Sequence, residues 1–341
     1  MEWRKLKAII CSQPGELRLV ERPEPNSAPD EVLVRIHRVG LCGTDYHIFK
    51  GNQPFLAYPR VMGHELAGVV VSAPAGCGFA VGQTITINPY LACGKCRSCQ
   101  RGKPNCCRNV TVLGVHADGG MCDLISVPVT AVLDATGLSL DQAAMVEFLA
   151  IGAHAVARSG IGQGDRALVV GAGPIGIGTA IFAQLAGANV TLMDSRLARL
   201  KIPREQLGMD QVIVANSEAL ETLSQQTDGE FFDVVYDATG AIAAMCSGLS
   251  YVGHGGTYVL ISVVKEDLKF PDPEFHKRET TLMASRNALS DDFARVIAAI
   301  KSGAIPTSVL HTHSIAAEDM PREVPRLIDE AEDVIKAIAV F

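Results

Sequence analysis

The sequence has few of the features that mark nucleic-acid-binding, secreted or membrane-spanning proteins. Its 341 residues carry a net charge of −7 and contain no basic run, which argues against a nucleic-acid partner. The N-terminal stretch MEWRKLKAII is charged, and its apolar run is too short for a signal peptide. No internal repeat or low-complexity segment is present. We therefore expect a cytoplasmic protein, and its length predicts two domains at roughly 150 residues each.

One segment lacks charge altogether. Residues 167–193 are uncharged and long enough to cross a bilayer. The segment begins with β-branched residues, passes through a cluster of glycines and ends in a second β-branched run. This order indicates strand, turn, helix and strand, so we expect no membrane span and no membrane partner.

Ten cysteines in a chain without an export signal indicate metal ligands and buried thiols, because a disulfide cluster needs an oxidising compartment. Four of them follow the spacing C-x2-C-x2-C-x7-C, namely Cys93, Cys96, Cys99 and Cys107. Two-residue gaps let neighbouring sulfurs converge on one ion, and four thiolates are typical of structural zinc, whereas ferredoxin-like clusters have other spacings. A zinc with four protein ligands has no open position, so the chemistry must lie elsewhere.

Candidates for a second metal site are Cys42 in GLCGTDYH and His64 in GHELAG, each beside glycines. On their own, a cysteine and a histidine are more often buried core residues than metal ligands. Glu147 lies in an otherwise apolar stretch, AAMVEFLAIGAHAV, and a buried carboxylate needs a cation. Three such ligands leave the fourth position open, as a catalytic zinc requires.

Residues 166–194 are typical of a dinucleotide site. A β-branched strand runs into a G-x-G-x-x-G turn, formed by Gly171, Gly173, Pro174, Ile175 and Gly176. A second strand ends in Asp194, about 20 residues further on, where an acid binds the ribose hydroxyls of NAD and repels the extra phosphate of NADP. We therefore expect NAD, although Arg196 and Arg199 weaken this preference.

The remaining segments give the outline of both domains. Extended runs at 17–20 and 31–38, separated by prolines, predict a β-rich N-terminal domain. The segments 232–240 and 255–264 read as further strands of a parallel doubly wound sheet, with Thr239, Gly240, Ile261 and Ser262 beside the cofactor. We expect Pro203 to break the helix after the second strand. The tail predicts helices over 291–302 and 320–331, with a short strand over 305–315.

Together, GHE, the CGxCxxCxxGxxxxC array and the glycine-rich turn resemble the medium-chain zinc-dependent alcohol and polyol dehydrogenases, nearly end to end. GNQPFLAYPRVMGHE, GVHADGG and DPEFHKRETTLMASRNA resemble the branch that oxidises polyols and sugar acids such as L-galactonate. The resemblance implies an α/β fold: a β-rich GroES-like catalytic domain (1–150 and 288–341) and a Rossmann NAD-binding domain (151–287). It also implies one catalytic and one structural Zn²⁺, and a homodimer or homotetramer.

The resemblance places catalytic zinc on Cys42 and His64, with either Glu65 or Glu147 completing the inner sphere. Thr44 and His47 match the family's proton relay, which runs through a cofactor ribose hydroxyl. Asp45 matches the family's acid that orients the zinc histidine, or it caps the helix near Cys42. Arg199 matches the family's basic residue near the adenosine ribose, and Phe148 stands where the polyol branch has proline. Outside the resemblance, Arg286 with Asn287 lies near the second crossing between the domains, where the arginine would bind a substrate carboxylate, the cofactor or the other domain. His116 and Asp118 would face the cleft.

These inferences predict a zinc-dependent oxidoreductase that transfers a hydride from a secondary hydroxyl of a polyol or sugar acid to NAD. One alternative is a dehydrogenase of simple alcohols or threonine. Another is an NAD-binding redox sensor with only structural zinc. The relay residues Thr44 and His47 favour an enzyme, because a binding module needs no proton relay. A zinc-free quinone reductase would leave Cys42 and His64 unexplained.

Overall fold

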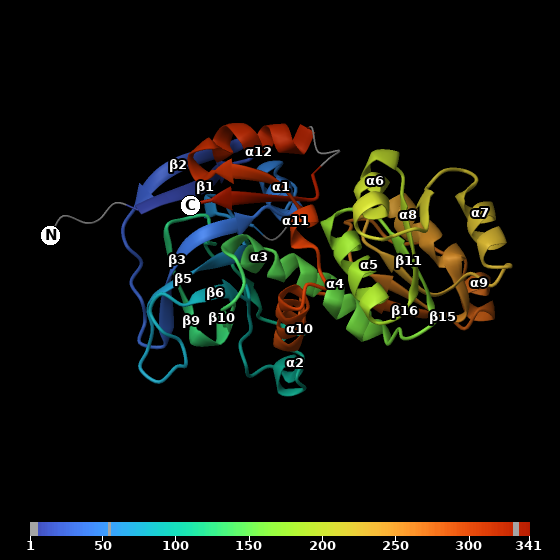
Figure 1. Cartoon of the computed structure of the whole chain (residues 1–341), viewed down its shortest axis with the longest axis horizontal. Helices are drawn as coiled ribbons and strands as arrows, with labels where there is room; N and C mark the ends of the chain where they lie inside the picture. The colour runs from blue at the N-terminus through green and yellow to red at the C-terminus, as the bar shows by residue number, and fades with distance from the viewer. Residues whose placement is uncertain (1–5, 54–55, 330–333) are drawn as a thin grey trace. The chain divides into compact units, whose positions relative to one another are not determined.

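The computed structural model describes residues 6–53, 56–329 and 334–341, which fold into two compact units (Figure 1). The first unit comprises Met1–Glu147 and Leu289–Phe341, and the second comprises Phe148–Ala288. Helix α4 (Val146–Ser159) begins at the end of the first unit and continues into the second. No helix among the described residues is long and apolar enough to cross a membrane.

The first unit is rich in strands, most of them antiparallel. Its larger sheet has the order β10-β6-β5-β3-β18-β17, with β9 also paired to β3. The bounds are β3 Glu31–Gly40, β5 Glu65–Ser72, β6 Thr84–Ile87, β9 Leu124–Pro128, β10 Val132–Asp134, β17 His311–Ala316 and β18 Lys336–Val340. A smaller sheet, β2-β1-β4, contains β1 Leu6–Gln13, β2 Glu16–Arg22 and β4 Arg60–Val61. Because β18 pairs with β3, the end of the chain completes the N-terminal sheet.

The helices of this unit are short. They are α1 Gly43–Phe49, α2 Arg97–Gln100, α3 Leu140–Ala144, α10 Ser290–Lys301, α11 Thr307–Leu310 and α12 Met320–Asp329. Those predicted over 291–302 and 320–331 are therefore present, although 330–331 fall outside the described residues. The strand predicted over 305–315 is wrong in its first half: residues 307–310 form α11 behind Pro306, and β17 starts only at His311. Pro306 fixes its own φ at −77°, which favours a helical turn after it.

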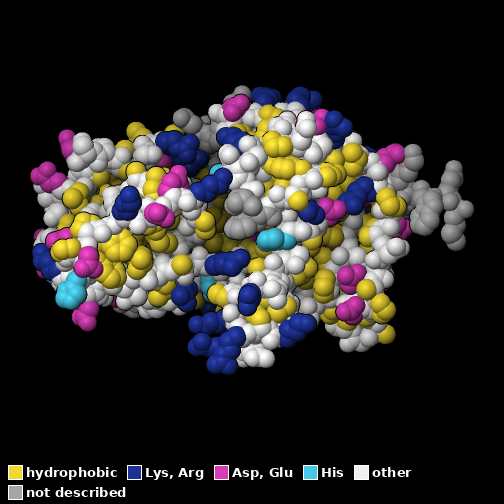
Figure 2. Space-filling view, turned by 180° about the vertical axis from the view of Figure 1, so that it is seen from behind, with side chains coloured by type: hydrophobic (Ala, Val, Ile, Leu, Met, Phe, Trp, Pro, Cys, Tyr) yellow, Lys and Arg dark blue, Asp and Glu magenta, His cyan; other side chains and the backbone are white. Residues whose placement is uncertain are grey.

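A separate two-stranded hairpin forms the neck of a small lobe. Strand β7 (Tyr90–Leu91) pairs with β8 (Thr111–Val112), and the residues between them, 92–110, are called the thiolate lobe here. The lobe has five exposed cationic side chains and no acidic residue: Lys95, Arg97, Arg101, Lys103 and Arg108. Figure 2 shows a group of Lys and Arg side chains on this part of the surface. The chain as a whole has a net charge of −7, so the thiolate lobe is a local concentration of positive charge on an acidic protein.

The second unit is a six-stranded parallel sheet with the order β13-β12-β11-β14-β15-β16. The strands are β11 Arg166–Val170, β12 Asn189–Asp194, β13 Val212–Val214, β14 Phe232–Asp237, β15 Val252–Leu260 and β16 Thr281–Ala284. The helices are α5 Pro174–Leu185, α6 Leu197–Gln206, α7 Ala219–Gln226, α8 Ile242–Ser247 and α9 Asp272–Lys277. The order reverses between β11 and β14, and ligands of such sheets bind beyond the strand ends at that point.

The expected break at Pro203 is wrong, because α6 continues through this residue to Gln206. Proline removes one backbone donor, and only three helical residues follow it. The carbonyl of Pro203 accepts from the amides of Leu207 and Met209, and the residue is buried. These bonds and the packing of the ring compensate for the missing intrahelical bond.

Candidate active site

Three side chains of metal-ligating types, from two separate segments, converge in the first unit. Cys42 precedes α1, His64 precedes β5, and Glu65 is the first residue of β5. One ligand atom of each lies within 4.8 Å of the others. His64 is 5% exposed, and its Nδ1 has no hydrogen-bond partner among the described residues. A buried, unpaired ring nitrogen beside a thiol and a carboxylate fits zinc, which binds sulfur, nitrogen and oxygen in one tetrahedron.

The electrostatics of this group also favour a cation. Burial lowers the pKa of His64, but Asp45 and Cys42 outweigh burial and raise it well above its ordinary value. Burial and, to a lesser extent, the charge of Glu147 raise the pKa of Glu65 to about 7, against the lowering effect of Lys336. The site therefore concentrates negative charge, which a bound divalent cation would neutralise.

Asp45 holds both ligand-bearing segments through their backbones. It is fully buried; its Oδ2 accepts from the amide of Cys42 at 2.9 Å and its Oδ1 from the amide of Gly63 at 3.3 Å. Of the two roles considered for Asp45, capping of α1 is the one these bonds describe. The carboxylate thereby fixes Cys42 and the residue before His64 in one arrangement.

Glu65 forms a buried ion pair with Lys336 of the last strand. Lys336 Nζ lies 2.7 Å from both carboxylate oxygens and donates to the carbonyl of Leu41 at 3.1 Å. Lys336 is 1% exposed and Glu65 is fully buried. Gly40 leaves room for the carboxylate, because a Cβ at this position would lie 2.0 Å from Glu65 Oε2. The last strand thus supplies the counterion of Glu65.

Glu147 is held differently. It is 3% exposed and accepts a hydrogen bond from the hydroxyl of Tyr90 on β7. Burial raises the pKa of Tyr90 well above its ordinary value, and Glu147 raises it further, so the phenol remains a donor. Glu147 is not part of the 4.8 Å group, although its charge acts on both His64 and Glu65. The assignment of the third ligand to Glu65 or Glu147 stays open.

Thr44 and His47 lie three residues apart on α1, directly after Cys42. Residues with this spacing are neighbours on one helix face. Thr44 is half-buried, whereas His47 is exposed. The helix thus carries a half-buried hydroxyl two residues after Cys42 and an imidazole at the surface, an arrangement that fits the predicted proton relay.

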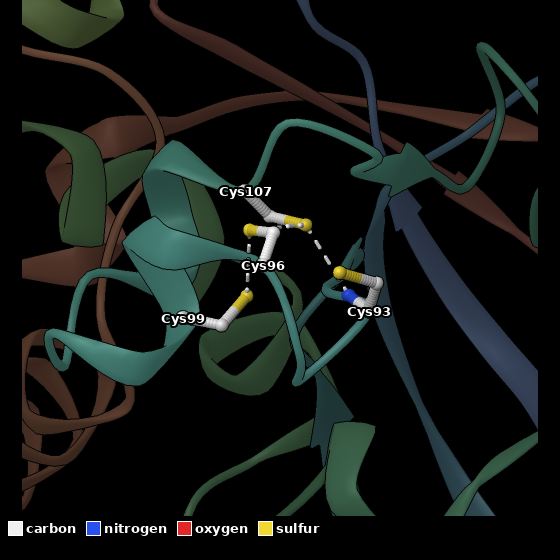
Figure 3. Close-up of side chains that lie close together, drawn as sticks. All are labelled: Cys93, Cys96, Cys99 and Cys107. Atoms are coloured by element: carbon white, nitrogen blue, oxygen red, sulfur yellow. Dashed lines mark hydrogen bonds between the residues drawn. The ribbon is translucent and has the colours of Figure 1, made fainter.

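The four cysteines of the thiolate lobe form a second cluster (Figure 3). Their sulfurs lie within 4.8 Å of one another, with Cys96 Sγ 3.5 Å from Cys99 Sγ and 3.8 Å from Cys107 Sγ. Backbone N–H groups of Cys99 and Arg108 lower the pKa of Cys96 to about 6. Desolvation and the hydrogen bonds with Cys96 and Cys107 raise that of Cys99 to about 12. Four thiolates this close need a cation, and the set fits a closed structural zinc.

The glycine turn of the second unit is shaped for close approach. A Cβ on Gly176 would lie 1.7 Å from the carbonyl oxygen of Gly171, which itself has a φ of +101°. A Cβ on Gly173, by contrast, would meet only the Arg199 guanidinium, at 3.8 Å. The turn is thus closed on its inner side and open at Gly173, directly before α5. The free N–H groups at the start of α5 can bind a pyrophosphate there.

Asp194 ends β12 beside this turn. Its Oδ2 accepts from the amide of Ala172 and its Oδ1 from the amide of Arg196, both at 2.8 Å. The side chain is 7% exposed and fixed to the glycine turn itself. Each oxygen retains an acceptor site for a ribose hydroxyl.

A second carboxylate, Asp237, organises the neighbouring strand ends. It is fully buried, and its Oδ1 accepts from the amide and the hydroxyl of Thr239 at 2.9 and 2.7 Å. Its carbonyl oxygen accepts from the amide of Ile261 at 3.0 Å. Burial raises the pKa of Asp237, and the bonds from Thr239 oppose this shift. Asp237 therefore positions the two segments that were predicted to contact the cofactor, including Gly240 and Ser262.

The remaining predicted residues lie outside both metal groups and the glycine turn. Asp118 accepts hydrogen bonds from Arg22 and Arg60 at 2.7 and 3.2 Å, and His116 accepts one from the amide of Val112. Phe148 is fully buried. Arg286 is exposed near the end of the second unit, and its three possible roles stay predictions.

The sequence interpretation missed three residues: Tyr90, Asp237 and Lys336. Lys336 had a signal, because it is the one charge in the apolar run VIKAIAVF. Asp237 lies at the end of a predicted strand, where polar side chains of parallel sheets gather. Tyr90 had no signal in the sequence except its place shortly before the first cysteine of the array.

Comparison with known proteins identifies the family of the chain. Residues 28–137 match the alcohol dehydrogenase GroES-like domain, and residues 174–302 match the zinc-binding dehydrogenase model. The chain is 40% identical to the L-galactonate-5-dehydrogenase of Escherichia coli K12 over 337 residues, 98% of this chain and 99% of that protein. It is 30% identical to the sorbitol dehydrogenase of Halalkalibacterium halodurans, over 90% of this chain and 92% of that one.

Solved structures agree with the sequence relatives. An alcohol dehydrogenase of Escherichia coli CFT073 in complex with NADH superposes with a TM-score of 0.92 at 28% identity, covering 99% of both chains. A zinc-binding dehydrogenase of Sinorhizobium meliloti 1021 bound to NADP gives 0.91 at 27% identity, covering 99% of this chain and 100% of that one. The resemblance and the fold class predicted from the sequence are confirmed. The chain belongs to the medium-chain, zinc-binding alcohol dehydrogenase family, whose members are oxidoreductases that act on CH–OH groups with a nicotinamide dinucleotide.

Proposed function

We propose that the protein oxidises a secondary hydroxyl of a sugar acid resembling L-galactonate, with NAD as the hydride acceptor. The observation that carries the proposal is the Cys42–His64–Glu65 group, to which no other residue of the described part of the chain adds a ligand atom within 4.8 Å. The assignment of residues 1–150 and 288–341 to metal binding and 151–287 to the cofactor is part of the proposal.

Zinc, when bound there, supplies a Lewis acid that favours loss of a proton from a substrate hydroxyl. The chain's own residues then have three tasks. Asp45 and Lys336 keep the ligand-bearing segments in place through the bonds described above. The Thr44 hydroxyl receives the proton, and the exposed imidazole of His47, a side chain that commonly serves as a proton shuttle, passes it to solvent.

A negatively charged substrate fits the distribution of charge in the first unit. The thiolate lobe has five exposed cations, and Tyr90 in its neck donates a hydrogen bond to Glu147, one of the candidates for the third zinc ligand. A concentrated positive charge raises the encounter rate of anions and is screened by salt. The 40% identical relative, named L-galactonate-5-dehydrogenase, supports the same substrate class.

A substrate panel tests this proposal. We expect NADH formation with aldonates and a kcat/KM for them that falls about tenfold between about 0.01 M and about 0.15 M salt, because the lobe is screened. A neutral alditol of the same chain length is the matched control and is expected to show little salt dependence. Full turnover of alditols with none of aldonates would contradict the proposal.

The preference for NAD rests on Asp194. Asp194→Asn keeps the shape of the side chain but removes its charge, so we expect kcat/KM for NAD to fall about 10- to 100-fold and that for NADP to rise. The measurement is the ratio of the two kcat/KM values. Arg199→Gln is the matched control, because it lies at the same turn and is expected to weaken both cofactors. An unchanged ratio in Asp194→Asn would show that discrimination lies elsewhere.

Two alternatives remain distinguishable. A threonine dehydrogenase is suggested by relatives of that name, one of them 33% identical over 77% of the chain, and it would be revealed by turnover of L-threonine in the same panel. A redox sensor with only structural zinc would bind NAD but stay silent with every alcohol.

The compartment and assembly are proposed more briefly. All ten cysteines are free, which supports a reducing cytoplasm. Among the described residues, β16 is an edge strand that pairs only with β15, and its Leu282 is 41% exposed, which supports a homodimer or homotetramer.

A further inference from the structure

The strand that enters the thiolate lobe also reaches Glu147, one of the two candidates for the third ligand of the catalytic metal. Tyr90 is the first residue of β7 and lies opposite Val112 of β8, the strand that leaves the lobe. Its amide donates to Asn88 Oδ1 at 3.0 Å, and the amide of Leu113 donates to the carbonyl of Pro89 at 3.1 Å. The backbone of Tyr90 is therefore fixed by both strands of the neck.

The side chain of Tyr90 leaves this neck and donates its hydroxyl hydrogen bond to Glu147 Oε1. Glu147 lies 57 residues further along the chain, near the start of α4, and is 3% exposed. Each carboxylate oxygen has two acceptor sites, so the Tyr90 bond takes one site of Oε1 and limits the directions in which Glu147 can face a cation or a water. Tyr90 thus restricts how Glu147 can serve the metal centre.

The two carboxylates of the site are held by different chemistry. Both oxygens of Glu65 accept from the charged Lys336, whereas Glu147 accepts from the neutral Tyr90. A neutral donor leaves the charge of Glu147 uncompensated, so this carboxylate remains available to neutralise a cation. Partners of this kind commonly tune metal affinity by 10- to 100-fold, as an order of magnitude.

We propose that Tyr90 is a positioning residue of the catalytic zinc site, which fixes the orientation of Glu147 and makes it depend on the neck of the thiolate lobe. The inference rests on the proposed function, because it requires a zinc ion on Cys42 and His64. It assigns the lobe a role in catalysis, in addition to its structural zinc.

The test compares Tyr90→Phe with Tyr58→Phe. Tyr58 belongs to the same unit, and its hydroxyl donates to the carbonyl of Ile48 instead of a carboxylate. Zinc-loaded proteins are mixed with a chromogenic chelator, and zinc release is followed in time. We expect Tyr90→Phe to release the catalytic zinc about 10- to 100-fold faster than wild type, with release from the four thiolates unchanged. Tyr58→Phe is expected to match wild type.

A double variant shows whether Tyr90 acts through Glu147. Tyr90→Phe combined with Glu147→Gln is expected to release zinc no faster than Glu147→Gln alone, because both changes remove one interaction. Multiplicative effects would overturn the proposal, as would equal release by Tyr90→Phe and Tyr58→Phe. Wild-type protein that binds a single zinc per chain would overturn the proposed function and this inference together. Two zinc ions with equal release in both tyrosine variants would overturn only the inference.

Discussion

Cys42→Ser is expected to lose about four orders of magnitude in kcat/KM, while the protein keeps its fold. A metal Lewis acid contributes several kcal/mol to transition-state stabilisation, and about 1.4 kcal/mol corresponds to a factor of ten. Cys42 is also the residue that caps α1, and serine is a preferred residue at that position. The substitution therefore removes a thiolate ligand and retains the start of the helix. Zinc content should fall by one ion per chain.

Cys77→Ser is the matched control, because Cys77 belongs to the same unit and to neither metal group. It is expected to retain zinc content and turnover. Circular dichroism and thermal unfolding of both variants would show that the fold is preserved. If Cys42→Ser kept wild-type turnover together with its full zinc content, the metal site would have been assigned to the wrong residues.

The features that the sequence predicted well are those encoded in short, contiguous patterns. The glycine turn, Asp194 and the four cysteines each depend on spacing within one segment, and their geometry follows from local chain stereochemistry. The parallel sheet of the second unit follows from the alternation of strands and helices. Helix α11 was missed because four residues after a proline carry too little periodicity to indicate a helix.

Contacts between distant segments were beyond such patterns. Lys336 and Glu65 are 271 residues apart, and only the pairing of β18 with β3 brings the lysine to the carboxylate. The same holds for Tyr90 and Glu147, whose meeting depends on the neck of the thiolate lobe. Asp45 shows a subtler limit: its place beside the zinc histidine was expected, but its hydrogen bonds to two backbone amides could not be predicted from spacing.

The Glu65–Lys336 pair leads to the second large effect. Lys336→Met is expected to destabilise the protein by about 3–5 kcal/mol, because it leaves a fully buried carboxylate without its counterion. The apolar replacement fills a similar volume, so the loss reports charge rather than a cavity. The free energy of unfolding, obtained from urea titration of zinc-free protein, is the quantity to measure.

Two companion variants separate charge from packing. Lys336→Arg keeps the positive charge and is expected to lose less than Lys336→Met. The double variant Lys336→Met with Glu65→Gln removes both charges, so it should recover a large part of the loss, because a neutral amide is far less costly to bury than an unpaired carboxylate. Recovery would show that the loss of stability in Lys336→Met comes from the unpaired charge of Glu65, which the lysine of the last strand normally compensates. A double variant as unstable as Lys336→Met would place the loss in packing around Leu41 and Gly40 instead.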